Sequence, residues 1–225
     1  MTKKVQNQEE VIVAETVSKA EKFFENHGKK VLAGLVAVLV LVGVGFFYKS
    51  HSDKNEVAAQ ELIYGAQENL KGETPNYELA LNGDGVVAGF LDVIEQYGST
   101  PAGNLAKHYA GICYLKSGDL ENAAAYLAKF SPVKGLPGEV VNAQNLGLQG
   151  DIAVENGDYE AAVKLFAKAV KASDNLYTTP LYLRKQGLAL KALGRNAEAN
   201  AAFEKILAAY PASIDAREAE KLMAE

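Results

Sequence analysis

Apolar residues form one uninterrupted run near the start of the chain, from Val31 to Tyr48. Its 18 residues include no charge, no side-chain amide and no proline, and as a helix they extend about 27 Å. The hydrocarbon core of a bilayer is about 30 Å thick, and flanking lysines can reach its surface. The run therefore predicts a transmembrane helix over residues 31–48. No small-residue cleavage site follows it, which favours an uncleaved anchor over a signal peptide.

A second apolar pattern precedes this run, within the leader of residues 1–30. Val13, Val17, Ala20 and Phe24 recur at intervals of four and three, which predicts an amphipathic helix from about Glu9 to Asn26. Two interpretations stay open: a helix that binds lipid or a partner, and a weakly ordered leader that becomes helical only near lipid. Four lysines lie in the 20 residues before the apolar run and two in the 20 after it, which predicts a cytoplasmic N-terminus.

The rest of the chain repeats one pattern three times: a glycine, a second glycine seven residues later, an alanine after five more and a bulky apolar residue after another four. The three sets are Gly111/Gly118/Ala123/Leu127, Gly150/Gly157/Ala162/Phe166 and Gly187/Gly194/Ala199/Phe203. The second glycine suits the left-handed end of a helix, and Asp119 and Asp158 then suit the N-cap of the next one. We expect the alanine to face the first glycine and the bulky residue to fill the space between hairpins.

This spacing closely resembles the tetratricopeptide repeat, most clearly where Leu183, Gly187, Leu190, Gly194, Ala199, Phe203 and Pro211 follow one another. The resemblance implies an all-α fold, a solenoid of helical hairpins over residues 49–225. The expected repeats cover about 104–130, 143–173 and 180–211, with an insertion at Ser131 to Gly138. A polar cap helix is expected over residues 213–224.

A degenerate first hairpin is expected over residues 54–97. Its helices would run from Glu56 to Leu70 and from Val86 to Tyr97. The loop between them, Gly72 to Gly85, contains Pro75 and a turn formed by Asn82, Gly83, Asp84 and Gly85.

Charge and residue chemistry argue against catalysis and nucleic-acid binding. Residues 51–225 have 16 Lys and Arg against 23 Asp and Glu, and an acidic domain does not suit nucleic acid. The three histidines are His27, His51 and His108, of which the first two flank the predicted span and cannot meet the third in one site. Cys113 is the single cysteine, so its place in a repeat helix suggests packing. We expect no enzyme, no metal, no cofactor and no small-molecule substrate.

The whole architecture resembles a narrower group, the ancillary subunit of the bacterial SecYEG translocon. The leader ending Phe23-Phe24-Glu25-Asn26-His27-Gly28-Lys29 carries this resemblance most sharply, together with one span and a repeat domain beyond it. It implies an inner-membrane protein with one span and a periplasmic repeat domain. The implied partners are translocon subunits, a periplasmic chaperone, and unfolded or extended segments of exported chains. An envelope scaffold for cell division or outer-membrane assembly is the alternative, because such scaffolds share the repeat.

The binding groove of tetratricopeptide repeats is lined mainly by the first helix of each hairpin. Carrying those positions over to this sequence gives Leu105, His108, Tyr109, Ile112, Gln144, Asp151, Leu181, Arg184, Lys185, Leu188 and Lys191. The Lys and Asn set that grips a C-terminal carboxylate in some members is absent from this pattern. The mixed set better suits an extended or partly unfolded segment, although its basic residues could still contact an acidic tail.

Overall fold

The computed structural model describes residue 18, residues 38–47 and residues 49–224, and it divides the chain into two units, Met1–Lys54 and Asn55–Glu225. In the first unit, residues 38–47 are helical and their apolar side chains are exposed. Among the described residues, no helix is both long and apolar enough to cross a membrane. Residues 31–37 and Tyr48 of the predicted span lie outside the described residues, as does the predicted helix Glu9–Asn26 except for residue 18.

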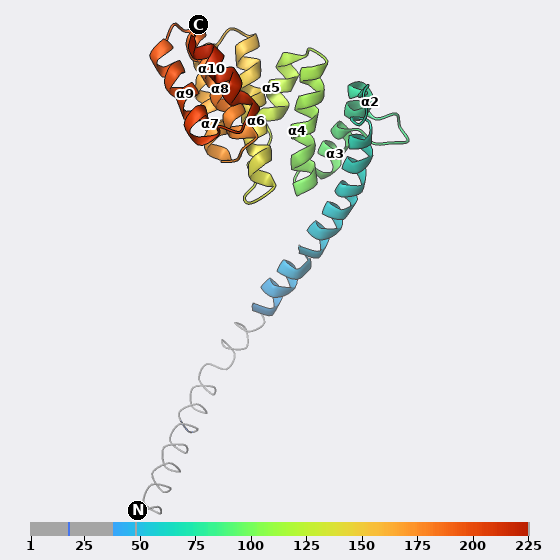
Figure 1. Cartoon of the computed structure of the whole chain (residues 1–225). Coiled ribbons are helices and arrows are strands. Elements are labelled where there is room, and N and C mark those ends of the chain that lie inside the picture. Colours follow the sequence, from blue (N-terminus) through green and yellow to red (C-terminus); the bar gives the residue numbers. More distant parts are fainter. Residues whose placement is uncertain (1–17, 19–37, 48, 225) are drawn as a thin grey trace, which may run out of the picture. The chain divides into compact units, whose positions relative to one another are not determined.

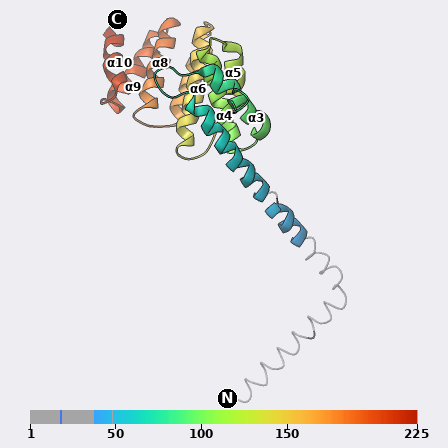
Figure 2. The same cartoon turned by 90° about the vertical axis from the view of Figure 1, so that its right-hand side faces the viewer.

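The second unit is a solenoid of antiparallel helices, which confirms the all-α prediction for the described residues. A helix ending at residue 68 is followed by α2 (Tyr77–Asn82), α3 (Phe90–Tyr97), α4 (Pro101–Lys116), α5 (Leu120–Ala128), α6 (Gly138–Glu155), α7 (Tyr159–Ala172), α8 (Thr178–Ala192), α9 (Asn196–Ala209) and α10 (Ile214–Ala224). Successive hairpins lie side by side along this unit (Figures 1 and 2).

The turns within the three clear hairpins form as the sequence predicts. Gly118, Gly157 and Gly194 all have positive φ, between 73° and 83°. The side chains of Asp119 and Asp158 then accept hydrogen bonds from backbone N–H groups in the first turns of α5 and α7. Each turn is short because one left-handed glycine ends the first helix and the next residue already caps the second.

The first glycine of each repeat has a different partner from the expected alanine. A Cβ atom added at Gly111, Gly150 or Gly187 would lie 2.3–2.6 Å from the side chain of Leu127, Phe166 or Phe203 respectively. The bulky residue therefore packs directly over the glycine of its own hairpin. The missing side chain makes room for that residue, and Ala123, Ala162 and Ala199 are fully buried.

The leading hairpin differs from the prediction in its loop. Residues 77–82 form the short helix α2, whose N-cap Asn76 accepts a hydrogen bond from the backbone N–H of Leu79. The following turn is held by Asp84, which accepts hydrogen bonds from the N–H groups of Val86 and Val87. Because the turn occupies these residues, the second helix begins at Phe90 rather than at Val86.

Three buried apolar clusters stabilise the solenoid. One extends from Ala59 to Cys113, a larger one extends from Ala143 to Ala219, and a small one joins Ala123, Leu127 and Ile152 between them. Helices α5 and α6 pack together much more sparsely than α7 and α8 do. The junction between the first two clear repeats is therefore less tightly packed than the junction between the second and the third.

Candidate functional site

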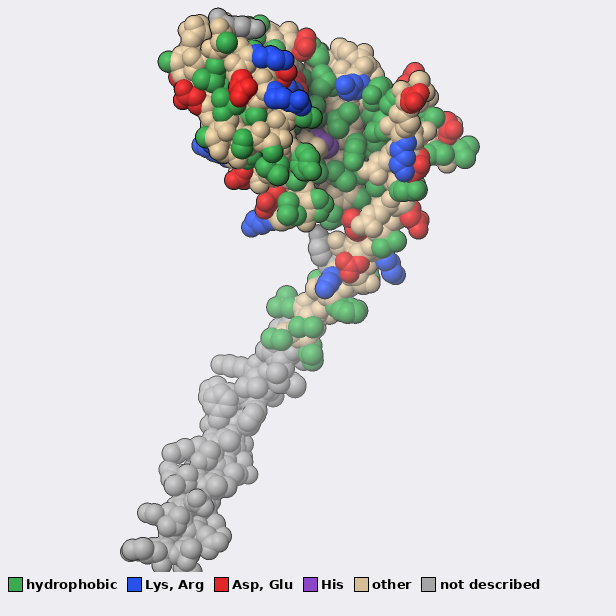
Figure 3. All heavy atoms as spheres, in the orientation of Figure 1, with side chains coloured by type: hydrophobic (Ala, Val, Ile, Leu, Met, Phe, Trp, Pro, Cys, Tyr) green, Lys and Arg blue, Asp and Glu red, His purple; other side chains and the backbone are tan. Residues whose placement is uncertain are grey.

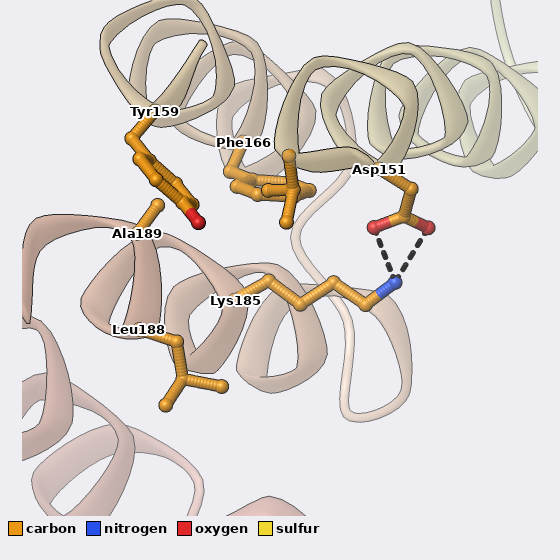
Figure 4. Close-up of a pocket in the computed structure, with 7 residues that line it drawn as sticks. Asp151, Tyr159, Phe166, Lys185, Leu188 and Ala189 are labelled. Carbon is orange, nitrogen blue, oxygen red and sulfur yellow. Dashed lines mark hydrogen bonds and ion pairs between the residues drawn. The ribbon is translucent and has the colours of Figure 1, made fainter. Parts of the chain in front are cut away.

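An open cavity lies between the first helices of the second and third clear repeats. It has a volume of about 220 Å³ and is lined by Asp151 and Val154 of α6, Tyr159 and Phe166 of α7, and Lys185, Leu188 and Ala189 of α8 (Figure 4). We call it the α6/α8 notch. Three of the predicted groove residues, Asp151, Lys185 and Leu188, meet here.

Apolar and aromatic side chains form the interior of the α6/α8 notch. Phe166 is 1% exposed and stacks on Tyr182, with ring centroids 6.4 Å apart. Burial, together with the nearby Asp151 carboxylate, raises the pKa of Tyr182 to about 12, so its hydroxyl stays neutral. Leu188 is 38% exposed at the opening. The notch therefore presents a rigid aromatic base and an accessible aliphatic edge.

An ion pair crosses one side of the α6/α8 notch. The ammonium of Lys185 lies 2.7 and 2.6 Å from the two carboxylate oxygens of Asp151 (Figure 4). The same nitrogen lies 6.0 Å from the centre of the Phe166 ring. Both charged side chains are about one-third exposed, so the pair contributes about 1 kcal/mol at most. Its main effect is to fix the position of Lys185 beside the opening.

This arrangement suits the recognition of a side chain better than a chemical reaction. Pockets for drug-sized molecules usually have volumes of about 300–1,000 Å³, and the notch is smaller and open. Its interior offers apolar contact, while the ion pair can exchange hydrogen bonds with a passing peptide backbone. A bulky apolar side chain of an extended segment fits both properties.

The predicted groove residues of α4 lie apart from the α6/α8 notch. Leu105 and Tyr109 are half-buried against the N-terminal cluster, and the Tyr109 ring stacks on Phe90 with centroids 5.2 Å apart. Ile112 is also half-buried, and Gln144 of α6 is exposed. Figure 3 shows that the face over α4 is hollowed and that hydrophobic side chains are exposed within it.

His108 lies in the interior rather than on an accessible surface. It is 3% exposed, and its Nδ1 lies 3.2 Å from the side-chain nitrogen of Asn145, which is equally buried. Gln149 donates a hydrogen bond to the side-chain oxygen of Asn145, so the Asn145 amide donates to His108. Burial lowers the pKa of His108 to about 4. The residue is therefore a neutral hydrogen-bond acceptor that joins α4 to α6.

The remaining predicted residues of α8 are engaged by the terminal helix α10. Arg184 forms an ion pair with Asp215 at 2.6 Å, and Lys191 donates a hydrogen bond to the carbonyl oxygen of Leu222. Leu181 is half-buried against the C-terminal cluster. These two cations thus attach the cap helix, and they are not available to an acidic tail while α10 is in place.

Arg184→Glu is expected to loosen α10, because it places a carboxylate against Asp215. With the two side chains 27% and 14% exposed, we expect a local loss of about 1–2 kcal/mol and roughly tenfold faster amide exchange in residues 214–224. Hydrogen exchange with mass spectrometry measures this. The exposed Arg217, also on α10, supplies the matched control Arg217→Glu; equal exchange in both variants would contradict the anchoring role.

The sequence pattern does not identify Val154, Tyr159 or Ala189 as site residues, and it predicts only a packing role for Phe166. A signal for Tyr159 exists, because the residue directly after the capping aspartate is large and apolar in two repeats, Leu120 and Tyr159. Val154 and Ala189 carry no such signal, since apolar residues at these helical positions are usual in any core.

Together, the hairpins, their glycine-closed turns and the face formed by their first helices define an α-solenoid of the class that binds other proteins. The chain belongs to the tetratricopeptide repeat-like domain family, whose model matches residues 21–222. Among solved structures, the chain is similar to the crystal structure of MamA, with 21% identity over 60% of this chain and 76% of that one and a TM-score of 0.45. No curated protein matches the sequence.

Proposed function

We propose that this protein is a membrane-anchored module that binds extended segments of other proteins, and that it acts as an ancillary subunit of the bacterial translocon. In this role its repeat domain, on the periplasmic side of the inner membrane, would receive exported chains and pass them to a chaperone. The observation that carries the binding role is the α6/α8 notch, an apolar opening on the first-helix face of the solenoid.

Two features of the N-terminal region support the anchor. The described part of the apolar run, residues 38–47, is a helix whose large side chains are all exposed, from 56% for Val40 to 76% for Phe46. Such a helix suits a lipid environment, because exposing this much apolar surface to water is unfavourable. The lysine bias around residues 31–48 supports a cytoplasmic N-terminus.

The translocon role rests on the resemblance of the leader and of the architecture. A holder of exported chains must contact many unrelated sequences briefly, and a shallow apolar notch beside a polar rim suits such contacts. A scaffold for cell division or outer-membrane assembly would bind one partner in fixed proportion. Only a holder of exported chains is expected to slow the aggregation of an unrelated unfolded protein.

Leu188→Asp is expected to weaken this holding activity about tenfold, because it puts a carboxylate at the apolar edge of the α6/α8 notch. The full chain in detergent micelles is mixed with an unfolding reporter, and light scattering follows its aggregation. Lys164→Asp, on an exposed position of α7, is the matched control. Equal protection by the two variants would remove the notch from the binding surface, and no protection by the wild type would favour the scaffold.

A further inference from the structure

The loops that join successive repeats carry an unusual set of exposed apolar side chains. These residues are Val133, Leu136, Leu176, Tyr177 and Ile214, with exposed fractions from 42% for Val133 to 84% for Tyr177. We call this set the loop edge. Val133 and Leu136 lie between α5 and α6, Leu176 and Tyr177 between α7 and α8, and Ile214 at the start of α10.

Contacts within the repeat domain place these loops along one edge. The chain is antiparallel from helix to helix, so every connection between repeats falls at the same end of the hairpins. Asn104, near the start of α4, exchanges two 2.8 Å hydrogen bonds with the backbone of Ser131. Leu176 and Tyr177 line a common hollow of about 300 Å³ with Ile214.

The three short turns at the opposite edge have a different character. They are Ser117-Gly118-Asp119, Asn156-Gly157-Asp158 and Leu193-Gly194-Arg195, and none of these residues is an exposed large apolar one. The longer turn of the leading hairpin differs from them, since Val86 there is 92% exposed. Turns usually favour polar residues, so the exposed leucines, valine, tyrosine and isoleucine of the loop edge are not explained by loop structure. An exposed apolar edge on a folded domain indicates a contact surface.

The chain enters the repeat domain at the loop edge. The carboxylate of Glu56 accepts a 3.0 Å hydrogen bond from the backbone N–H of Ala102, in the first turn of α4. Glu56 is the eighth residue after Tyr48, where the apolar run ends. Eight residues of fully extended chain reach at most about 29 Å. A bilayer that holds the run thus lies within reach of this edge.

From these observations we propose that the loop edge rests on the lipid surface and inserts its apolar side chains among the headgroups. The proposal depends on the membrane anchor proposed above. Tyr177 has the amphipathic ring that is favoured at membrane interfaces, with Leu176 and Ile214 beside it. Exposed Lys134 and Lys171 lie here together with exposed Glu139 and Asp174, so apolar insertion rather than net charge drives the contact.

Because the domain is attached to the membrane anchor, even a weak contact is sufficient to keep the loop edge on the lipid surface. Scattered loop side chains bury little area each, and a free domain would bind lipid poorly. An attached domain instead meets the bilayer at a high effective concentration, which favours the bound state without any new contact. The solenoid would then stand with its polar turns away from the membrane.

Depth-dependent fluorescence quenching tests this placement. The full chain is reconstituted in vesicles of phosphatidylcholine and phosphatidylglycerol that contain nitroxide-labelled lipid, in a Cys113→Ala background. A polarity-sensitive nitrobenzoxadiazole probe is attached at Tyr177→Cys or Leu136→Cys. Asn156→Cys, on the opposite edge, is the matched control. All three positions are exposed, so the probe does not disturb the core.

We expect several-fold stronger quenching and a blue-shifted emission at positions 177 and 136 than at position 156, with little dependence on salt. Flotation of the same vesicles is measured in parallel. A chain that floats while all three probes are quenched equally overturns the lipid contact and leaves the anchor intact. A chain that fails to float overturns both the anchor and the lipid contact.

Discussion

Phe166→Ala is expected to destabilise the repeat domain by about 3–5 kcal/mol, the loss typical of a large aromatic side chain removed from a core. Phe166 is 1% exposed, covers Gly150 and stacks on Tyr182. Since domains are stable by only about 5–15 kcal/mol, the loss would be plain in urea or thermal unfolding. The exposed Lys168→Ala on the same helix is the control, with an expected change below about 0.5 kcal/mol.

A second substitution shows whether Gly150 and Phe166 act as a pair. Gly150→Ala alone is expected to cost about 1–3 kcal/mol, because its Cβ would lie 2.5 Å from the Phe166 ring. In the Phe166→Ala background the same change meets no ring, and the better helix propensity of alanine should make it neutral or stabilising by up to about 1 kcal/mol. Strictly additive effects would contradict the direct packing of the ring over the glycine.

The second large effect concerns pH and His108. Its pKa is about 4 in the folded protein, against an ordinary value of 6.5, because the ring is buried. Between these two values the unfolded chain binds a proton that the folded chain does not, so the free energy of unfolding falls as pH falls from 6.5 to 4. A pKa of about 4 in place of 6.5 lowers the free energy of unfolding by about 3 kcal/mol at low pH, and this loss is absent above pH 6.5.

His108→Asn isolates this contribution, because its side-chain oxygen can still accept the hydrogen bond from Asn145 and does not titrate. Carboxylates titrate in the same pH range, but they are common to both proteins and cancel in the comparison. Urea unfolding at several pH values should therefore show that wild type loses about 3 kcal/mol more than His108→Asn between pH 6.5 and 4. If the stability of wild type and of His108→Asn changed with pH in parallel, His108 would bind a proton as readily in the folded protein as in the unfolded chain, which would contradict the prediction.

The repeating glycines made most of the fold predictable from the sequence. Gly118, Gly157 and Gly194 predict a left-handed turn, and a capping aspartate after two of them predicts where the next helix begins. Spacing alone could not reveal which side chain covers the first glycine. Alanine and the bulky residue lie one helical turn apart on the same face, so only the packed structure separates them.

The binding surface is less predictable, because the repeat pattern locates groove positions within each helix separately. Asp151, Lys185 and Leu188 do meet at the α6/α8 notch. Arg184 and Lys191 have partners on α10, which is 31 residues away in sequence for both pairs, and His108 has a partner on α6. Contacts between residues so far apart in sequence cannot be predicted from the local spacing of apolar and polar residues.

Site-specific photocrosslinking tests the central claim, that the first-helix face binds protein segments. A photoreactive amino acid is placed at Leu188, at the opening of the α6/α8 notch, since the buried His108 could not reach a partner. The full chain is irradiated in native membranes, and captured proteins are identified by mass spectrometry against a control at Lys164. We predict capture of translocon subunits, chaperones and diverse exported chains from position 188 alone. Equal capture from both positions, or none, would contradict the account.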